Sequence, residues 1–326
     1  MNASPAIAVA DVTHHYGSRC ALDDLSLTIA PGEIFAFVGP NGGGKTTLFR
    51  LLTTLMPLQQ GSVTIDSLDL AHQVDRIRPL LGVVFQSPSL DKKLTVAENL
   101  RHHGHLYGLS GRELADRIDE MLSRLGIQAR AGDRVEKLSG GLRRRVELAK
   151  SMLHRPRILL LDEPSTALDP VARNDMWTYL ESIRKSEGVT VALTTHLLEE
   201  AEKADRLAIL NEGKLVALDT PDALRSTIGG DTITIRTAEP SPLATAITQE
   251  FDCQADVIDG SVRLEQAEGH RWIAKLVEAF PGKIDAITFS RPTLEDVFVA
   301  RTGHRFREDM GEALAEEVGQ GGASHE

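Results

Sequence analysis

One nine-residue stretch, Gly39 to Thr47, constrains this chain more than any other. It fits the phosphate-binding pattern G-x-x-x-x-G-K-[ST] with the residues Gly39, Pro40, Asn41, Gly42, Gly43, Gly44, Lys45, Thr46 and Thr47. An apolar run at 34–38 predicts a buried strand before it, and helical spacing from Lys45 to Leu55 predicts a helix after it. Glycines let backbone N–H groups face phosphate oxygens, and the helix N-terminus adds the positive end of its dipole.

The last residues of this loop carry the expected chemistry. Lys45 is expected to reach the β- and γ-phosphates, and the Thr46 hydroxyl is expected to ligate Mg²⁺. A glycine-rich turn that binds nothing would not require Lys followed by Thr. We therefore expect a nucleoside triphosphate site, and the choice of triphosphate depends on the rest of the chain.

Bulk properties exclude several classes of function. The 326 residues allow about two domains, and a net charge of −11 disfavours nucleic acid and anionic lipid as direct partners. No apolar run approaches the roughly 20 residues of a membrane helix. The first residues lack a basic and apolar signal sequence, so we expect a cytoplasmic protein. Cys20 and Cys253 lack metal-ligand spacing and are expected to be reduced thiols.

A second cluster of polar residues follows apolar strands. The run Ile158–Leu161 predicts a strand buried on both faces, and it ends in Asp162 and Glu163. Asp162 is expected to hold Mg²⁺, and Glu163 to orient and deprotonate a water. The next buried strand, 189–193, leads to His196. A lone histidine at a strand end is more often structural, so its role stays open at this point.

The first part of the chain predicts short strands. Residues 7–12 and 22–29 read as strands with a turn at 13–17, which contains Tyr16. From the residues alone, Tyr16 is an edge residue that packs on a sheet. The apolar run 81–85 predicts a further strand whose end carries Gln86. A hairpin is expected at 206–219.

Residues of about 87–156 predict a helical insertion. Thr95 with Glu98, and Ser110 with Glu113, form the spacing of capping boxes. Ser139 is expected to cap a helix whose first turn holds Gly140 and Gly141, at a cost of roughly 1 kcal/mol for each glycine against alanine. An anion at this helix N-terminus would explain the glycines. The arginines at 143–145 read as a solvated face.

These residues together resemble a known family. The order of Tyr16, the loop 39–47, Gln86, Leu138–Gly141, Ile158–Pro164, Ser165–Asp169 and His196 is similar to that of the ATP-binding subunits of ABC transporters, over residues 6–222. The resemblance implies an α/β fold of the P-loop NTPase type. It would combine a RecA-like sheet, an antiparallel β subdomain and the inserted helical subdomain, within an ATP-binding domain at 6–225.

The resemblance also implies the role of each residue. Tyr16 would stack on adenine, Gln86 would sense Mg²⁺ and attacking water, and His196 would contact the γ-phosphate. Asp162 would hold the metal, with Glu163 as catalytic base. Ser139, Gly140 and Gly141 would bind the γ-phosphate of ATP on a second copy, in a head-to-tail homodimer. The partner implied is a separate integral-membrane permease, which places the chain at the cytoplasmic face of the membrane.

One departure points to a subgroup. The signature usually continues with Gln, and this chain has Leu142 followed by arginines, which resembles exporters of the daunorubicin-resistance type. Export of a drug, an antibiotic or another hydrophobic compound is the leading interpretation; lipid, polysaccharide or ion export stays open. A GTP switch is disfavoured because no Asn-Lys-x-Asp motif occurs. A soluble ABC ATPase that acts on ribosomes or DNA, and a small-molecule kinase, are less favoured.

The remaining residues predict an accessory part. The pattern at 230–303 reads as β-α-β-β-α-β, the ferredoxin-like order, with a hairpin at Asp259-Gly260. The stretch 291–303 resembles the terminal helix of the same exporter subgroup. A dimer-stabilising role and a regulatory role are about equally supported. Residues 306–326 are acidic and glycine-rich, which predicts disorder.

Overall fold

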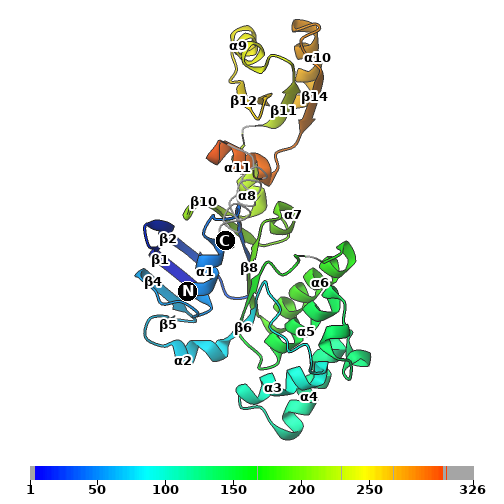
Figure 1. The fold of residues 1–326 in the computed structure, drawn as a ribbon. Coiled ribbons are helices and arrows are strands. Elements are labelled where there is room, and N and C mark those ends of the chain that lie inside the picture. Colours follow the sequence, from blue (N-terminus) through cyan, green and yellow to red (C-terminus); the bar gives the residue numbers. More distant parts are fainter. Residues whose placement is uncertain (1–3, 167, 229, 267, 304–305, 307–326) are drawn as a thin grey trace, which may run out of the picture.

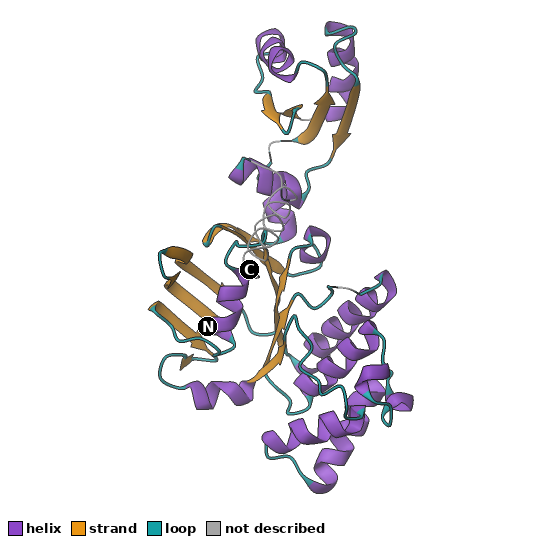
Figure 2. Ribbon diagram, in the orientation of Figure 1, coloured by secondary structure: helices purple, strands orange, loops and turns teal. Residues whose placement is uncertain are grey.

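The computed structural model describes residues 4–166, 168–228, 230–266, 268–303 and 306. Three β-sheets and the helices around them build the described part (Figure 2). The expected disordered tail lies outside the described residues except for Phe306. No helix in the described ranges is long and apolar enough to cross a membrane.

An antiparallel sheet with the strand order β2-β1-β4-β5 carries the first part of the chain. Its strands are β1 (Ile7–Tyr16), β2 (Arg19–Ile29), β4 (Gln60–Ile65) and β5 (Leu68–Asp69). The turn expected at 13–17 is wrong, because His14, His15 and Tyr16 pair with Leu22, Cys20 and Arg19 of β2. The strand therefore continues through Tyr16, and the reversal occurs at Gly17, where φ is 59°. Tyr16 becomes the last residue of a strand next to the phosphate loop.

A six-stranded sheet with the order β10-β9-β3-β8-β7-β6 forms the centre of the molecule (Figure 1). Its strands are β3 (Ile34–Val38), β6 (Leu81–Val84), β7 (Ile158–Asp162), β8 (Thr190–Thr195), β9 (Arg206–Asn211) and β10 (Lys214–Asp219). Only the β9–β10 hairpin is antiparallel; the other neighbours pair in parallel. All residues of β3, β7 and β8 are buried. Their carboxyl ends, at Val38, Asp162 and Thr195, lie at one edge of the sheet, where such sheets place ligands.

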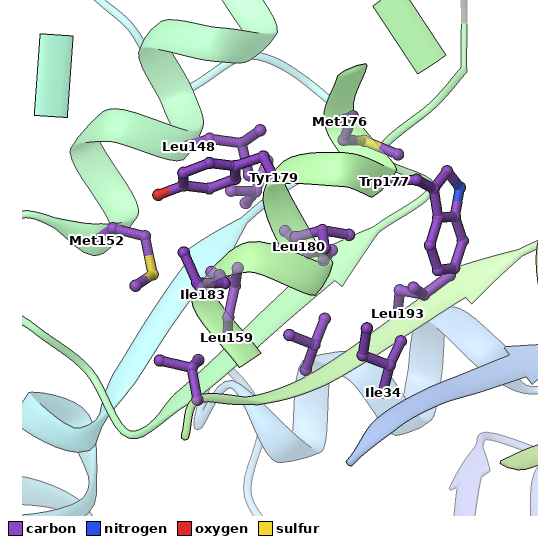
Figure 3. Packing of buried hydrophobic residues seen from close by; sticks show 14 of the residues in the cluster. Ile34, Leu148, Met152, Leu159, Met176, Trp177, Tyr179, Leu180, Ile183 and Leu193 are labelled. Atoms are coloured by element: carbon purple, nitrogen blue, oxygen red, sulfur yellow. The ribbon is translucent and has the colours of Figure 1, made fainter. Parts of the chain in front are cut away.

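Helices pack against this sheet, and a group of them forms a helical region on one side of it. They are α1 (Lys45–Leu52), α2 (Val74–Ile77), α3 (Val96–Leu106), α4 (Gly111–Arg124), α5 (Gly140–Met152), α6 (Pro170–Glu187), α7 (Leu198–Ala201) and α8 (Pro221–Ser226), with 3-10 turns η1 (Arg78–Leu80), η2 (Gln128–Arg130) and η3 (Val135–Lys137). Figure 3 shows Leu148 and Met152 of α5 beside Tyr179 and Ile183 of α6, above Leu159 of β7. This packing joins the helical stretch to the central sheet.

The ends of the helices match the sequence in part. Helix α1 ends at Leu52, three residues earlier than expected, and Thr54 follows with φ of 61°. Thr95 and Glu98 form the expected capping box of α3. The second expected box is wrong, because the Ser110 side chain makes no cap hydrogen bond. Helix α4 still begins at Gly111, but the φ of 57° at this residue departs from the helical value, so its first turn lacks the regular geometry in which an N-cap side chain accepts a backbone N–H.

The third sheet lies beyond α8 and is antiparallel, with the order β12-β13-β11-β14. Its elements are β11 (Asp231–Arg236), α9 (Pro240–Phe251), β12 (Asp256–Ile258), β13 (Ser261–Gln266), α10 (Gly269–Ala279) and β14 (Ala286–Ser290). They follow in the order expected from the sequence, and they enclose a separate apolar core. Helix α11 (Leu294–Thr302) then returns to the main body, where Leu294, Val297 and Phe298 join the larger core.

Candidate active site

The phosphate loop is held in shape by neighbouring backbone. Gly42 and Gly44 have φ of 80° and 102°, a region that favours glycine. A Cβ on Gly39 would lie 2.1 Å from the Leu210 carbonyl oxygen, and one on Gly44 would lie 2.8 Å from that of Ala21. The β9–β10 turn also donates to the loop, from the Gly213 N–H to the Gly43 carbonyl at 3.2 Å. Glycine is therefore required here by close backbone packing as well as by phosphate chemistry.

Lys45 is the buried cation of the loop. Its ammonium donates to the carbonyl oxygens of Gly39 and Pro40 at 2.6 and 2.7 Å. Burial lowers the pKa of Lys45 to about 8, and the carboxylates of Glu163 and Asp162 oppose this shift. Lys45 is therefore charged at neutral pH and fixed inside the loop.

A cavity of about 300 Å³ opens beside Lys45. Its walls are formed by Tyr16, Arg19, Ala21, Asn41, Gly42, Gly44, Lys45, Thr46, Thr47, Arg50 and Glu163. The ring of Tyr16 is 45% exposed, and its hydroxyl donates to the Met56 sulfur at 3.2 Å. The cavity thus presents an aromatic ring at one residue and cationic side chains at three others.

Asp162 is buried next to this cavity. Its carboxylate accepts a hydrogen bond from the Thr194 hydroxyl at 2.6 Å, and the same hydroxyl accepts from the Glu163 N–H at 3.0 Å. Burial raises the pKa of Asp162, and the negative charge of Glu163 adds to the rise, while the Thr194 hydrogen bond opposes it. Thr194 therefore holds Asp162 and the backbone of Glu163 in one fixed arrangement.

The Glu163 carboxylate is the meeting point of three segments. It accepts from the Gln86 amide at 3.2 Å and from the Thr166 hydroxyl at 3.2 Å, and it lies 3.2 Å from His196 Nδ1. Burial alone would raise the pKa of Glu163, but the hydrogen bond and charge of His196 lower it. The same hydrogen bond raises the pKa of His196. Glu163 also has φ of 42°, a strained conformation for a residue with a side chain.

The segment Ser139–Gly141 lies away from the cavity beside Lys45. Ser139 caps α5 as expected, since its hydroxyl accepts from the Leu142 N–H at 3.3 Å. Ser139 and Gly140 are exposed, and neither they nor Gly141 line the cavity beside Lys45. The structure thus brings the other predicted site residues together and leaves these three on a separate surface.

One of the three arginines after this motif, Arg144, is buried, which corrects the interpretation of all three as a solvated face. Arg144 is 7% exposed, and it donates to the Phe85 carbonyl at 2.8 Å, to Glu147 at 3.1 Å and to the Glu163 carbonyl at 3.4 Å. Glu147 is 2% exposed and accepts from the Ser89 N–H at 2.7 Å. Helix α5 therefore connects the segment around Gln86 to Glu163 through buried polar groups.

The sequence interpretation also missed the arginines at the cavity. Arg19 and Arg50 line it, and no ion pair of either is found within the described ranges. The guanidinium of Arg19 lies 3.1 Å from the position of a Cβ on Gly42. Their spacing could have revealed them, since Arg19 follows Tyr16 by three residues and Arg50 lies one helical turn after Thr46. Thr194 and Arg144 gave no such signal.

The residues present fit Mg²⁺ bound together with phosphate. Thr46 is an exposed residue of the cavity wall, and the Asp162 carboxylate is buried directly before Glu163, another wall residue; both supply oxygen ligands of the kind this cation takes. No group of three or more His, Cys, Asp or Glu that could hold a metal occurs in the described part of the chain. The two oxygen ligands of Thr46 and Asp162 suit Mg²⁺, which takes its other ligands from phosphate and water.

Comparisons with known proteins agree on one family. A family model described as ABC transporter matches residues 22–166. The daunorubicin resistance ATP-binding protein DrrA2 of Streptomyces coeruleorubidus is 37% identical, over 92% of this chain and 96% of its own. A Nod factor export ATP-binding protein I of Rhizobium johnstonii is 36% identical, over 91% and 95%.

Solved structures extend the comparison to the fold. An ATP-binding subunit of an ABC transporter superposes with a TM-score of 0.63 at 29% identity, covering 69% of this chain and 93% of its own. A dimeric ATP-binding cassette bound to ADP and Pi superposes with a TM-score of 0.60 at 28% identity, covering 66% and 98%.

Proposed function

This chain belongs to the ATP-binding subunits of ABC transporters, and on that premise we propose that it powers export of a drug, antibiotic or other hydrophobic compound through a separate membrane-spanning permease. Its activity is ATP hydrolysis coupled to transport. We place it at the cytoplasmic face of the membrane, where it contacts the bilayer only through the permease. The likeness to a daunorubicin resistance protein over nearly its whole length supports this substrate class.

The nucleotide is assigned to the cavity beside Lys45. We assign the adenine ring to Tyr16, and the phosphates to the backbone of the loop 39–47 and to the ammonium of Lys45. The charges of Lys45, Arg19 and Arg50 support a polyanionic ligand there. Thr46, Asp162 and Gln86 would hold Mg²⁺, which, when bound, neutralises phosphate charge and orients the terminal phosphoryl group.

The observation that carries the proposal is the environment of Glu163. Its carboxylate borders the cavity and is held by Gln86, Thr166 and His196 at 3.2 Å each. A lowered pKa keeps it ionised at neutral pH, so it can orient a water and accept its proton. His196, with its raised pKa, can carry positive charge next to the terminal phosphate.

The second half of each site would come from another copy of the chain. Ser139, Gly140 and Gly141 are exposed or half-exposed at the start of α5 and do not serve the cavity of their own chain. We infer that they bind the γ-phosphate of ATP held by a second copy in a head-to-tail homodimer. The dimeric structure of a related cassette supports this arrangement.

We divide the chain into an ATP-binding domain at 6–225, with its helical subdomain at about 87–156, and an accessory domain at 230–303. Separate apolar cores support the division, because Ile233, Val262 and Leu276 pack together apart from the larger cores. The strand order β12-β13-β11-β14 supports a ferredoxin-like accessory domain. Its last helix, α11, anchors it on the ATP-binding domain.

The test of the catalytic assignment is Glu163→Gln. We expect ATP turnover to fall by about 10²–10⁴-fold while ATP binding is kept, because the amide cannot accept the proton of the water. The control is Glu199→Gln, which removes the same charge from an exposed residue of α7. Turnover of the Glu163 variant within twofold of the control would remove Glu163 from this role.

The substrate class needs a separate measurement. The chain would be purified together with the membrane protein that co-purifies with it, and ATPase stimulation would be compared among hydrophobic drugs, lipids and oligosaccharides. Stimulation by hydrophobic drugs is expected. Stimulation by oligosaccharides alone would favour the second candidate, which the likeness to Nod factor export proteins supports.

A further inference from the structure

Strand β14 forms an unprotected edge of the third sheet. Among the described strands, β14 pairs with β11 alone, and no described strand pairs with its other side. Four of its five residues are exposed, and Phe289 is 45% exposed. In Figure 1 it lies at the outer side of the part of the molecule beyond α11. An open strand of this kind presents unpaired N–H and C=O groups to another strand.

The other sheet edges of the described chain are protected. Edge strands usually avoid pairing by being short, charged or covered. Strands β2, β10 and β12 carry charged residues such as Asp23, Lys214 and Asp256, β5 has two residues, and β6 is mostly buried. Strand β14, with the sequence Ala-Ile-Thr-Phe-Ser, has neither charge nor proline. Strand β14 thus differs from the other edge strands in having no feature that prevents pairing, which points to a second strand as its partner.

The sequence around β14 is complementary to itself. If two copies pair antiparallel with Thr288 opposite Thr288, then Ile287 lies opposite Phe289 of the other copy, and Ala286 opposite Ser290. One step further along, Asp285 lies opposite Arg291. The two-fold symmetry repeats each pair, so two apolar pairs and two ion pairs flank the centre. No other register centred in this strand sets Asp285 opposite Arg291.

The side chains that would make these contacts are available. Asp285, Phe289 and Arg291 are exposed, and no ion pair of Asp285 or Arg291 occurs among the residues that the structure describes. Phe289 and Ile287 share the sheet face of their β11 partners, Ile233 and Ile235, which is the face of the buried core. Pairing with a second copy would extend that apolar face across the dimer axis.

We propose that β14 is a docking surface for β14 of a second copy of this chain, in an antiparallel register centred on Thr288. The contact would join two third sheets into one continuous sheet. It involves no residue of the nucleotide site, so it would hold two copies together without ATP. A five-residue edge buries less area than a stable interface usually needs, so the contact alone is weak and dynamic.

Site-directed crosslinking tests the register. In a C20S/C253S background, single substitutions T288C, A286C and S290C are oxidised without nucleotide. The T288C Cα atoms would lie about 4.5–5.5 Å apart, within disulfide range, whereas those of A286C would lie about 14 Å apart. We expect T288C to crosslink at least about tenfold faster than either control. Absence of this difference would overturn the proposal.

Charge exchange tests the ion pairs with the same reporter. D285R places arginine opposite arginine, and R291D places aspartate opposite aspartate, so each variant alone should crosslink about tenfold more slowly through T288C. A mixture of the two variants restores both opposite-charge pairs and should crosslink at the original rate as a heterodimer. A mixture no faster than its components would refute the pairing. ATPase activity of each variant reports that it is folded.

The result of the crosslinking experiment does not depend on whether the head-to-tail ATP dimer forms. The crosslink is measured without nucleotide, where ATP cannot join the two active sites. Loss of the T288C crosslink would leave the ATP-dependent dimer untouched, and loss of the ATP-dependent dimer in a Ser139 variant would leave the crosslink untouched.

Discussion

Replacing Arg144 by methionine tests whether the buried polar groups of α5 support both the fold and the chemistry. The substitution removes the donor to the Phe85 carbonyl, to Glu147 and to the Glu163 carbonyl. Glu147 would then be a buried carboxylate without its cation, and its pKa is already raised by burial. Breaking a buried ion pair on one side costs about 3 kcal/mol or more.

This cost converts into a measurable change in melting temperature. For a domain of this size, 1 kcal/mol lowers Tm by about 2–4 °C, so R144M should lower Tm by about 6–12 °C. Differential scanning fluorimetry measures the shift. The matched control is R143M, which removes a neighbouring arginine with no ion pair within the described residues and should shift Tm by at most about 2 °C.

A second substitution separates stability from catalysis. R144M/E147L removes the unpaired carboxylate and should recover more than half of the lost Tm, because an apolar pair replaces a broken ion pair. The donors to Phe85 and Glu163 stay absent, so kcat should remain at least about tenfold low while KM for ATP is unchanged. A double variant with wild-type kcat, or an R144M variant that melts with R143M, would refute this reasoning.

Three other predictions concern the nucleotide site. Ser139→Arg should abolish ATP-dependent dimerisation in light scattering, and a dimer that persists would contradict the assignment of Ser139 to a second copy. Tyr16→Ala should raise KM for ATP about 5- to 100-fold through loss of stacking, whereas Tyr16→Phe should keep it near the original value. The pKa of His196 is raised, so its stabilisation by Glu163 is fully present below about pH 6.5 and is lost as pH rises through the raised value. The Tm difference between the original chain and His196→Ala should therefore shrink above pH 6.5. A Tm difference that grows as pH rises would contradict the stabilisation of His196 by Glu163.

Local patterns predicted most of the architecture. The phosphate loop, the buried strands before Asp162 and His196, and the capping box at Thr95 rest on residues close in sequence, where one short segment fixes the geometry. The errors at residues 13–17 and at Ser110 share one origin, because both depend on geometry that the neighbouring residues do not reveal. The strand through Tyr16 is set by pairing with β2, and the missing cap hydrogen bond of Ser110 accompanies the positive φ of Gly111. Neither is visible in the local pattern.

The sequence by itself determined which loop carries the phosphate-binding pattern, which carboxylates follow the buried strands, and which helix N-terminus carries two glycines. Only the tertiary structure decided how these groups act together. Arg144 looked solvated because helical spacing shows which residues share a face, but not which segment covers that face. Similarly, the edge position of β14 follows from the order of the strands in its sheet. That order depends on pairing between residues far apart in the chain, which a local sequence pattern does not contain.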